Sequence, residues 1–256
     1  MQIYQPKNGY CYNSDTLFLY DFALPFLKMR HHLLEVGAGC GVLGLLCARD
    51  SKCKLTMIEK NPKMAEFCAH NLRINHTQAH LICADFLEYD FNSQPTQSVN
   101  SQNAESQSIE SQKTYSTTQA AFDIILSNPP FYHDGVVKSQ NSDIFSARYA
   151  QNLPFLDFAR KVNSLLKPTG EFIFCYDAKA IFHLFNVLHS YKMRPICLRF
   201  VYPKLDKSAT LVLCRCKKNS KSQCKILPPL VTHIDLDFTQ EVLGIYKKAK
   251  TWSIKC

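Results

Sequence analysis

The stretch 32-HLLEVGAGCGVLGLLCARD-50 joins three patterns that together predict the start of an α/β fold. It begins with the apolar run of a buried strand, passes through three closely spaced glycines and ends in a pattern typical of a helix. Gly37, Gly39 and Gly41 allow the backbone to turn tightly and to approach a ligand. The following helix would present free N–H groups at its N-terminus. A plain tight turn between strand and helix would also account for the glycines.

Strand and helix patterns alternate along most of the remaining chain. Four further strands are predicted at 54–61, 79–86, 122–127 and 171–177, and helices at 41–50, 62–75, 155–170 and 178–191. Asn61 and Pro62 suit the N-cap and first position of a helix. The alternation predicts a parallel, doubly wound α/β sheet. Two last strands, 194–203 and 208–216, have a short link that permits antiparallel pairing, so we expect a seven-stranded, mostly parallel sheet with an antiparallel strand near its C-terminal end.

Residues 92–120 differ from everything around them, because Ser, Gln, Asn and Thr dominate and apolar residues are scarce. Such a composition predicts a disordered insertion in a surface loop, which a folded domain tolerates. The length of 256 residues then fits a single domain over 1–256, interrupted by this insertion. No signal-peptide pattern is visible, and Asp21 and Pro25 interrupt an early apolar run that is too short to cross a bilayer. We therefore expect a soluble, cytoplasmic protein.

Positive charge is concentrated near the C-terminus. The formal net charge is +9, and residues 192–256 hold 14 Lys or Arg against four acidic residues. This asymmetry indicates a polyanionic partner, although a solvated surface would give the same count. The candidates for contact with nucleic-acid phosphates are Arg194, Arg199, Lys204, Lys207, Arg215, Lys217 and Lys218. Twelve cysteines are present without a CxxC pair, so we expect reduced thiols and no metal site. Six of them lie in apolar contexts and are expected to pack as small apolar groups: Cys40, Cys47, Cys68, Cys83, Cys175 and Cys197.

Acidic residues end the second and third predicted strands, at the sheet edge that carries the glycine turn. Glu59 lies 22 residues after Gly37, where a carboxylate accepts hydrogen bonds from ribose hydroxyls in nucleotide-binding folds. Asp85 is placed to meet an adenine amino group, and the ring of Phe86 to cover the adenine face. Each acid alone would pass for a solvated loop residue. Together they predict a ligand that contains adenosine, and the absence of GxxxxGK[ST] argues against a phosphate-binding P-loop.

The fourth predicted strand ends in 128-NPPF-131 at the same edge. An exocyclic amine of a nucleobase is a poor nucleophile, because its lone pair is delocalised into the ring. The Asn128 side-chain oxygen and the Pro129 carbonyl could accept hydrogen bonds from the two N–H groups of this amine and so free its lone pair. Two prolines would hold the carbonyl rigidly, and Phe131 could stack on the flat target. A proline-rich turn with Phe131 in the core is the alternative without chemistry.

Several motifs resemble known families. The GxGxG spacing after Glu35 resembles class I S-adenosylmethionine-dependent methyltransferases, and NPPF resembles the [DNS]PP[YFW] signature of amino-group methyltransferases. The opening 5-QPKNGYCYNSDTLFLYDFA-23 is similar to that of the bacterial tRNA (adenine-N6) methyltransferases that modify position 37 of a valine tRNA. Residues 146–158, 202–218 and 238–248 resemble further segments of that family in the same order. Cys11, Tyr149 and Ala150 depart from its motifs.

The resemblance implies a class I methyltransferase fold, S-adenosylmethionine as cofactor and a tRNA adenine as substrate. It assigns the cofactor to Gly37, Gly39, Gly41, Glu59, Asp85, Phe86 and Asn128, and the adenine to Asn128, Pro129 and Phe131. Asp15 would order the entrance near the methionine moiety. Alternatives are an rRNA guanine-N2 or a protein glutamine-N5 methyltransferase, or a catalytically silent RNA-binding module. The first two usually carry extra domains for which this chain has little room.

Overall fold

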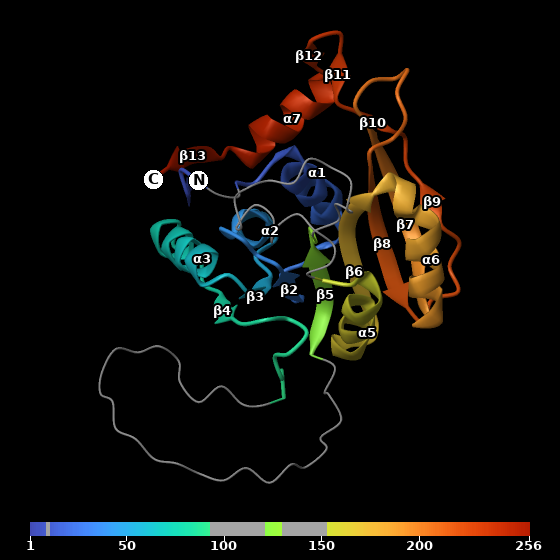
Figure 1. The fold of residues 1–256 in the computed structure, drawn as a ribbon, viewed down its shortest axis with the longest axis horizontal. Coiled ribbons are helices and arrows are strands. Elements are labelled where there is room, and N and C mark those ends of the chain that lie inside the picture. Colours follow the sequence, from blue (N-terminus) through green and yellow to red (C-terminus); the bar gives the residue numbers. More distant parts are fainter. Residues whose placement is uncertain (9–10, 93–120, 130–152) are drawn as a thin grey trace.

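The central feature of the computed structural model, which describes residues 1–8, 11–92, 121–129 and 153–256, is a nine-stranded sheet (Figure 1). Eight strands follow the order β10-β7-β8-β6-β5-β2-β3-β4, and β9 pairs with β7. Their bounds are β2 (His32–Val36), β3 (Lys54–Glu59), β4 (His80–Cys83), β5 (Phe122–Ser127), β6 (Leu166–Asp177), β7 (Met193–Tyr202), β8 (Leu211–Lys218), β9 (Lys225–Ile226) and β10 (Leu230–Val231). All seven predicted strands are present.

The strand directions confirm the doubly wound α/β class. β8 runs antiparallel to both of its neighbours, β6 and β7, whereas the other pairs of the sheet are parallel. The chain leaves β2 through β3 to β4 and then returns to place β5 on the other side of β2. The edge at the carboxyl ends of β2 and β5 is therefore the switch point, where open α/β sheets bind ligands.

Helices cover both faces of this sheet. α1 (Ser14–Ala23), α2 (Val42–Ser51) and α3 (Pro62–Ile74) lie on one face, and α5 (Phe155–Leu165) and α6 (Ile181–Ser190) on the other (Figure 1). Asn61 is the N-cap of α3, as predicted, and its side chain accepts the N–H of Met64. Short 3₁₀ turns cover Leu24–Phe26 and Ala178–Ala180. In the described part of the chain, no helix has the length and apolar character needed to cross a bilayer.

The predicted helix over 155–170 ends earlier than expected. α5 stops at Leu165, and Leu166 already pairs with Phe122 in the sheet. Leu166 has extended backbone angles and a fully buried side chain. Pro168 disfavours helical angles at Lys167, so the chain turns into the strand before the proline. The helix boundary is therefore set by both the proline and the pairing of Leu166.

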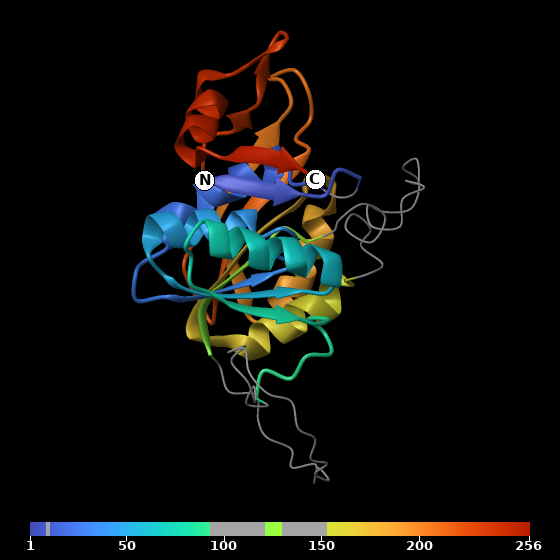
Figure 2. The same ribbon diagram turned by 90° about the vertical axis from the view of Figure 1, so that its left-hand side faces the viewer.

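Both ends of the described chain meet in a second small sheet. β1 (Gln2–Gln5) pairs in parallel with β13 (Trp252–Lys255), and Figure 2 shows the two strands side by side. α7 (Gln240–Ala249) precedes β13 and packs against α1, where the rings of Phe18 and Tyr246 lie parallel with centroids 6.5 Å apart. A hairpin of β11 (His233–Ile234) and β12 (Asp237–Phe238) precedes α7. The sequence pattern predicted none of these five elements, nor α1.

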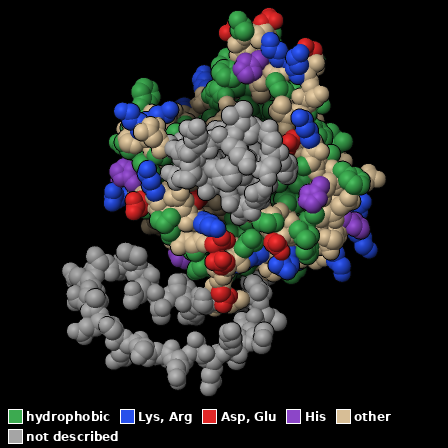
Figure 3. Space-filling view, viewed as in Figure 1, with side chains coloured by type: hydrophobic (Ala, Val, Ile, Leu, Met, Phe, Trp, Pro, Cys, Tyr) green, Lys and Arg blue, Asp and Glu red, His purple; other side chains and the backbone are tan. Residues whose placement is uncertain are grey.

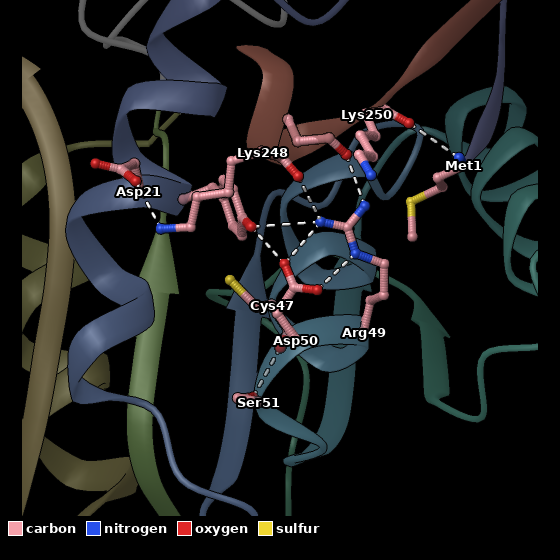
Figure 4. A network of polar contacts seen from close by, with 10 residues as sticks. Met1, Asp21, Cys47, Arg49, Asp50, Ser51, Lys248 and Lys250 are labelled. Atoms are coloured by element: carbon pink, nitrogen blue, oxygen red, sulfur yellow. Dashed lines mark hydrogen bonds and ion pairs between the residues drawn. The ribbon is translucent and has the colours of Figure 1, made fainter. Parts of the chain in front are cut away.

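A polar network joins α7 to the main domain (Figure 4). Arg49, near the end of α2, donates to the carbonyls of Ala249 and Lys248 at 2.6 and 3.1 Å and pairs with Asp50. Asp50 also accepts a short hydrogen bond from Tyr20 of α1. Lys248 Nζ lies 2.8 Å from Asp21 Oδ1. One guanidinium thus satisfies carbonyls at the end of α7, which helix geometry would leave without partners.

All twelve cysteines are free thiols, and eight of them are buried. The expectation of small apolar packing is confirmed for Cys40, Cys47, Cys68, Cys175 and Cys197. It is wrong for Cys83, which is exposed in β4 because this strand lies at the sheet edge.

Candidate functional site

A cavity of about 480 Å³ lies at the carboxyl ends of β2, β3 and β5. Six of the residues that the sequence assigned to a cofactor line it: Gly37, Gly39, Glu59, Asp85, Phe86 and Asn128. Gly41 is not part of its wall. The volume is within the range of sites for small molecules and cofactors. The structure therefore brings together residues that are spread over more than 90 positions of the sequence.

The glycine loop adopts the left-handed backbone that its composition predicted. Gly37, Gly39 and Gly41 have φ angles of 71°, 56° and 86°, which residues with a Cβ rarely adopt. The N–H groups of Gly37 and Ala38 bond to the carbonyl of Ile58 at 2.9 and 3.1 Å, so the loop is held to β3. Gly41 has a structural role as N-cap of α2, where an added Cβ would lie 2.7 Å from Cys68 Sγ.

Glu59 ties the end of β3 to this loop. Its Oε2 accepts the N–H of Gly39 at 2.6 Å, and its Oε1 accepts the N–H of Asn61 at 2.8 Å. Burial raises the pKa of this carboxyl, although the backbone N–H groups of Asn61, Gly39 and Lys60 act in the opposite direction. A carboxylate oxygen can accept more than one hydrogen bond. Both oxygens thus keep capacity for hydroxyl groups of a ligand, as the predicted ribose contact requires.

Asp85 and Phe86 follow β4 and are more constrained than the sequence indicated. Asp85 accepts Lys60 Nζ at 2.6 Å and the N–H of Leu87 at 2.8 Å. Burial opposes its ionisation, but these donors outweigh that cost and lower its pKa. Phe86 is 5% exposed and packs edge-on against Phe158, with centroids 5.5 Å apart. The adenine contacts of both side chains stay predictions, and Lys60 would share Asp85 with the ligand.

Glu35 is an acidic residue whose position in the site the sequence did not reveal. It is 2% exposed, lines the cavity and accepts the N–H of Gly44 at 3.0 Å. Burial raises its pKa to about 8, while the Gly44 N–H lowers it by a smaller amount and the charge of Glu59 adds a small rise. The carboxyl group thereby connects β2 to the first turn of α2 directly beneath the glycine loop.

Asn128 stands at the end of β5, one residue after Ser127. The Ser127 hydroxyl donates to the carbonyl of Val36 at 2.9 Å, which fixes β5 beside the glycine loop. Asn128 Nδ2 lies 3.4 Å from Thr16 Oγ1, and Asn128 Oδ1 accepts the thiol of Cys175 at 3.1 Å. Pro129 is buried. Phe131, the rest of NPPF, residues 93–120 of the predicted insertion and the 147–150 departure lie outside the described residues.

The N-terminal segment supplies cavity residues that no sequence motif pointed to as binding residues. Tyr12 and Thr16 line the cavity, and the Tyr12 hydroxyl donates to Thr251 Oγ1 at 3.0 Å. Asp15 does not line it; its carboxylate accepts from Asn13 at 2.9 Å, and burial raises its pKa. The entrance role that the resemblance gives to Asp15 stays a prediction. The contact between residues 12 and 251 has no local signal that could have revealed it.

The strand register divides six of the seven candidate basic residues between two edges of the sheet, whereas Arg199 lies within it, opposite Leu213 of β8. The β7–β8 turn that carries Lys204 and Lys207 follows the carboxyl end of β7, on the cavity side. The opposite edge holds Arg194, Arg215, Lys217 and Lys218, because Lys217 of β8 lies opposite Glu171 in the first half of β6. Figure 3 shows Lys and Arg at separate places on the visible face rather than in one continuous patch.

Three of these side chains form hydrogen bonds to partners in other elements of the fold. Arg215 forms two hydrogen bonds to Glu171, at 2.7 and 2.6 Å, and covers the ring of Phe26. Arg199 pairs with Glu241 at 2.5 Å. Lys218 donates to the carbonyls of Asn163 and Leu166 at 2.6 and 3.1 Å. The total charge of the C-terminal quarter therefore overstates the charge that is free to meet a partner.

Within the described residues, no group of three or more His, Cys, Asp or Glu is arranged to hold a metal ion.

Comparison with known families gives one domain match. Residues 33–127, from the first strand of the α/β unit to the last residue before Asn128, match the model of a methyltransferase domain. The matched segment thus contains the glycine loop, Glu59, Asp85 and β5.

Curated relatives agree with the resemblance seen in the sequence. Three Shewanella proteins named tRNA1(Val) (adenine(37)-N6)-methyltransferase are similar to this chain. The S. halifaxensis protein is 26% identical over 69% of this chain and 62% of its own length. The S. loihica protein is 30% identical over 57% of this chain and 51% of its own length. An S. baltica protein is 24% identical over 93% of this chain and 91% of its own length. The matches to the first two thus leave more than a third of those proteins uncovered.

Solved structures confirm the fold. A predicted O-methyltransferase from Agrobacterium tumefaciens superposes with a TM-score of 0.62 at 16% identity, over 94% of this chain and all of that one. TYW2 of M. jannaschii, solved in complex with AdoMet, gives a TM-score of 0.51 at 15% identity, over 81% of this chain and 76% of that one. The chain has the Rossmann-like fold of class I methyltransferases.

Substitution of Gly44 by alanine should destabilise the protein. An added Cβ would overlap Glu35 Oε2 and lie 3.0 Å from Met57 Cε. Overpacking of this kind costs about 1–3 kcal/mol, which denaturant unfolding measures. Gly244→Ala is the matched control, because this glycine is also helical and an added Cβ there would meet no atom within 4 Å. It should stabilise α7 by about 0.5–1 kcal/mol. Equal effects of the two substitutions would contradict the proposed crowding at Glu35.

Glu35 should make stability depend on pH. Its pKa is 4.5 in model compounds and about 8 in the fold, so the folded state holds the proton more tightly. The unfolding free energy should therefore fall as pH rises from 4.5 to about 8, and Glu35→Gln should remove part of this fall. Glu66→Gln, which changes an exposed residue of α3, serves as the control and should keep the wild-type profile. A Glu35→Gln profile parallel to wild type would refute the assignment.

Proposed function

We propose that this chain, which contains a methyltransferase domain over residues 33–127, transfers a methyl group from S-adenosylmethionine to the N6 amine of an adenine in tRNA. The observation that carries the proposal is the position of Asn128, in the wall of the cavity that also holds the glycine loop and Glu59. An amide oxygen and a backbone carbonyl can meet a planar amine there, beside a site for an adenosine-containing cofactor. The names of the Shewanella relatives support the substrate.

The residues of the cavity fit S-adenosylmethionine. The exposed backbone of Gly37 and Gly39 suits the amino-acid end of this cofactor, which needs carbonyls and N–H groups rather than a phosphate cradle. Glu59 offers its carboxylate to the ribose hydroxyls, and Asp85 to the adenine amine. When bound, the cofactor supplies an electrophilic methyl group on a sulfonium. A cavity of about 480 Å³ is large enough for such a ligand.

The chemistry that the protein must provide is mostly positioning. Asn128 Oδ1 and the Pro129 carbonyl would accept hydrogen bonds from the two N–H groups of the target amine. These bonds favour a pyramidal nitrogen with a free lone pair. Pro129 is buried and has a fixed φ, so its carbonyl loses little freedom when substrate binds. The amine loses its proton easily once the methyl group has arrived. No general base is therefore needed, and orientation and hydrogen bonding carry the rate. Phe131 completes this proposal as a stacking surface.

The tRNA part of the proposal is supported by the relatives and by the demands of the reaction. An adenine must leave its stack to enter the cavity, which costs least in a single-stranded loop such as the anticodon loop. We propose that residues 1–256 work as one methyltransferase domain in the cytoplasm. The pairing of β1 with β13 supports the first statement, because it connects both ends of the described chain beside the cavity.

Lys204 and Lys207 are the basic residues of the C-terminal quarter that best fit contact with RNA phosphates near the cavity. Their turn lies at the cavity edge, and β8 and β6 separate β7 from β5, which is a lateral distance of about 15 Å. Phosphates that flank a flipped base are within that distance. Phosphate contacts of this kind position the RNA, whereas the cavity selects the base.

The experiment that tests the function uses total tRNA from cells that lack this protein. We expect purified protein and labelled S-adenosylmethionine to produce labelled N6-methyladenosine, identified by mass spectrometry after digestion to nucleosides. If rRNA guanine or a protein glutamine were labelled instead, the tRNA adenine would be the wrong substrate. The protein would then be an rRNA guanine-N2 or a protein glutamine-N5 methyltransferase. Measurable cofactor binding without transfer to any of these would favour the silent RNA-binding module.

Asn128→Ala should lower turnover by at least about 100-fold, the usual effect of removing a group that acts mainly in the transition state. Cofactor affinity, measured by calorimetry, should change less than tenfold, because the glycine loop and Glu59 remain. Asn61→Ala is the control for a change in stability beside the cavity. It removes the N-cap of α3 and should lower the free energy of unfolding more than it changes turnover. A loss of cofactor affinity in Asn128→Ala as large as the loss of turnover would refute this division of roles.

The pair Lys204→Glu and Lys207→Glu should weaken tRNA binding and flatten its dependence on salt, because fewer counterions are released. Lys192→Glu with Arg194→Glu is the matched control, with the same change of charge at exposed residues of the opposite edge. Binding curves at several salt concentrations measure both effects. Equal losses in the two double variants would show that net charge, and not the cavity edge, determines RNA affinity.

A further inference from the structure

The side chain of Asn128 is held at both ends by partners from other elements of the fold. Its Oδ1 lies 3.1 Å from Cys175 Sγ of β6, and its Nδ2 lies 3.4 Å from Thr16 Oγ1 of α1. Thr16 and Asn128 line the cavity, whereas Cys175 is fully buried behind it. One partner thus contacts the amide oxygen and the other the amide nitrogen.

The two partners differ in what they specify. A hydroxyl group both donates and accepts, so Thr16 would accommodate either the oxygen or the nitrogen of the amide. A thiol donates weakly and is a poor acceptor. Burial raises the pKa of the Cys175 thiol well above its usual value, so the sulfur keeps its proton. A protonated thiol favours the amide oxygen over the NH₂ group.

The position of this thiol is a consequence of sheet pairing. In the parallel register of β5 and β6, Ser127 is opposite Phe174, so the next residues, Asn128 and Cys175, lie beside each other at the carboxyl edge. Cys175 is also opposite Leu213 of β8, within the interior of the sheet. The donor is thus carried by a rigid strand, and its location does not depend on the residues that follow Pro129.

We propose that Cys175 is a positioning residue that holds the Asn128 amide with Oδ1 available to the substrate amine. The inference rests on the proposed function. Oδ1 has two lone pairs, of which one accepts the thiol and the other remains for an N–H of the target. In the reversed orientation an NH₂ group would face the NH₂ group of the substrate, and two donors cannot bond to each other. The thiol therefore keeps Asn128 ready before substrate arrives.

Three variants of Cys175 separate hydrogen bonding from packing. Cys175→Ser keeps a donor and should retain kcat within about twofold. Cys175→Val fills the site without a donor and should lower kcat about five- to tenfold, as the loss of one neutral hydrogen bond implies. Cys175→Ala serves the same purpose if valine prevents folding. KM for tRNA and for S-adenosylmethionine should stay near wild type, because the thiol touches neither.

Cys47→Val is the matched control, because Cys47 is equally buried in α2 and its thiol makes no contact with Asn128. It should reduce stability as much as Cys175→Val does while leaving kcat unchanged. Wild-type kcat in Cys175→Val, or an equal loss of kcat in Cys47→Val, would overturn the proposal.

A second measurement does not depend on transfer. In protein labelled with ¹⁵N-asparagine, the side-chain NH₂ protons of Asn128, assigned by their absence in Asn128→Ala, should show NOEs to Thr16 in wild type and in Cys175→Ser. Cys175→Val should weaken these NOEs as the amide samples both orientations. NOEs from the NH₂ protons to the Cys175 β-protons in wild type would show the reversed amide and refute the inference. A wild-type protein inactive on tRNA would refute the proposed function alone, and the NOEs would still decide the orientation.

Discussion

The pairing of β5 with β2 is the constraint on which the rest of the site depends. The two strands are separated by 85 residues in sequence, yet Val36 and Ser127 lie opposite each other and are joined by the Ser127 hydroxyl. This pairing places the glycine loop and Asn128 at one edge, across the point where the strand order reverses. A one-residue slip in the register would turn the residues of β5 to the other face and move Asn128 relative to the loop.

A second constraint comes from the terminal segments, which form part of the wall. Asn71 of α3 is fully buried and donates to the carbonyls of Tyr4 and Cys40, so the first strand is bound to the glycine loop. Gln5 accepts the N–H of Tyr12 and donates to Ser253 at 2.6 Å. The cavity thus depends on contacts between residues near both ends of the chain, and the network at Arg49 holds the last helix in place.

The number of basic residues in the C-terminal quarter overstates the positive surface that is available to a polyanionic partner. The C-terminal quarter is strongly basic, as the sequence shows, but Arg199, Arg215 and Lys218 stabilise the fold through Glu241, Glu171 and backbone carbonyls. The antiparallel course of β8 then carries Arg215, Lys217 and Lys218 away from the cavity edge. A surface for a polyanion is made by the charges that remain exposed on one face, which composition cannot resolve.

From sequence alone, the strand and helix order between residues 32 and 216, with its seven strands, the glycine loop and the residues at the strand ends could be determined. These features depend on local patterns: apolar periodicity, glycine conformations and the capping by Asn61. The tertiary structure alone decided that Glu35 lies beneath the loop, that Tyr12 meets Thr251 and that Cys175 orients Asn128. Each of these depends on strand register or on contacts between distant segments, and such contacts leave no periodic signal in the chain because each requires a single residue at one place.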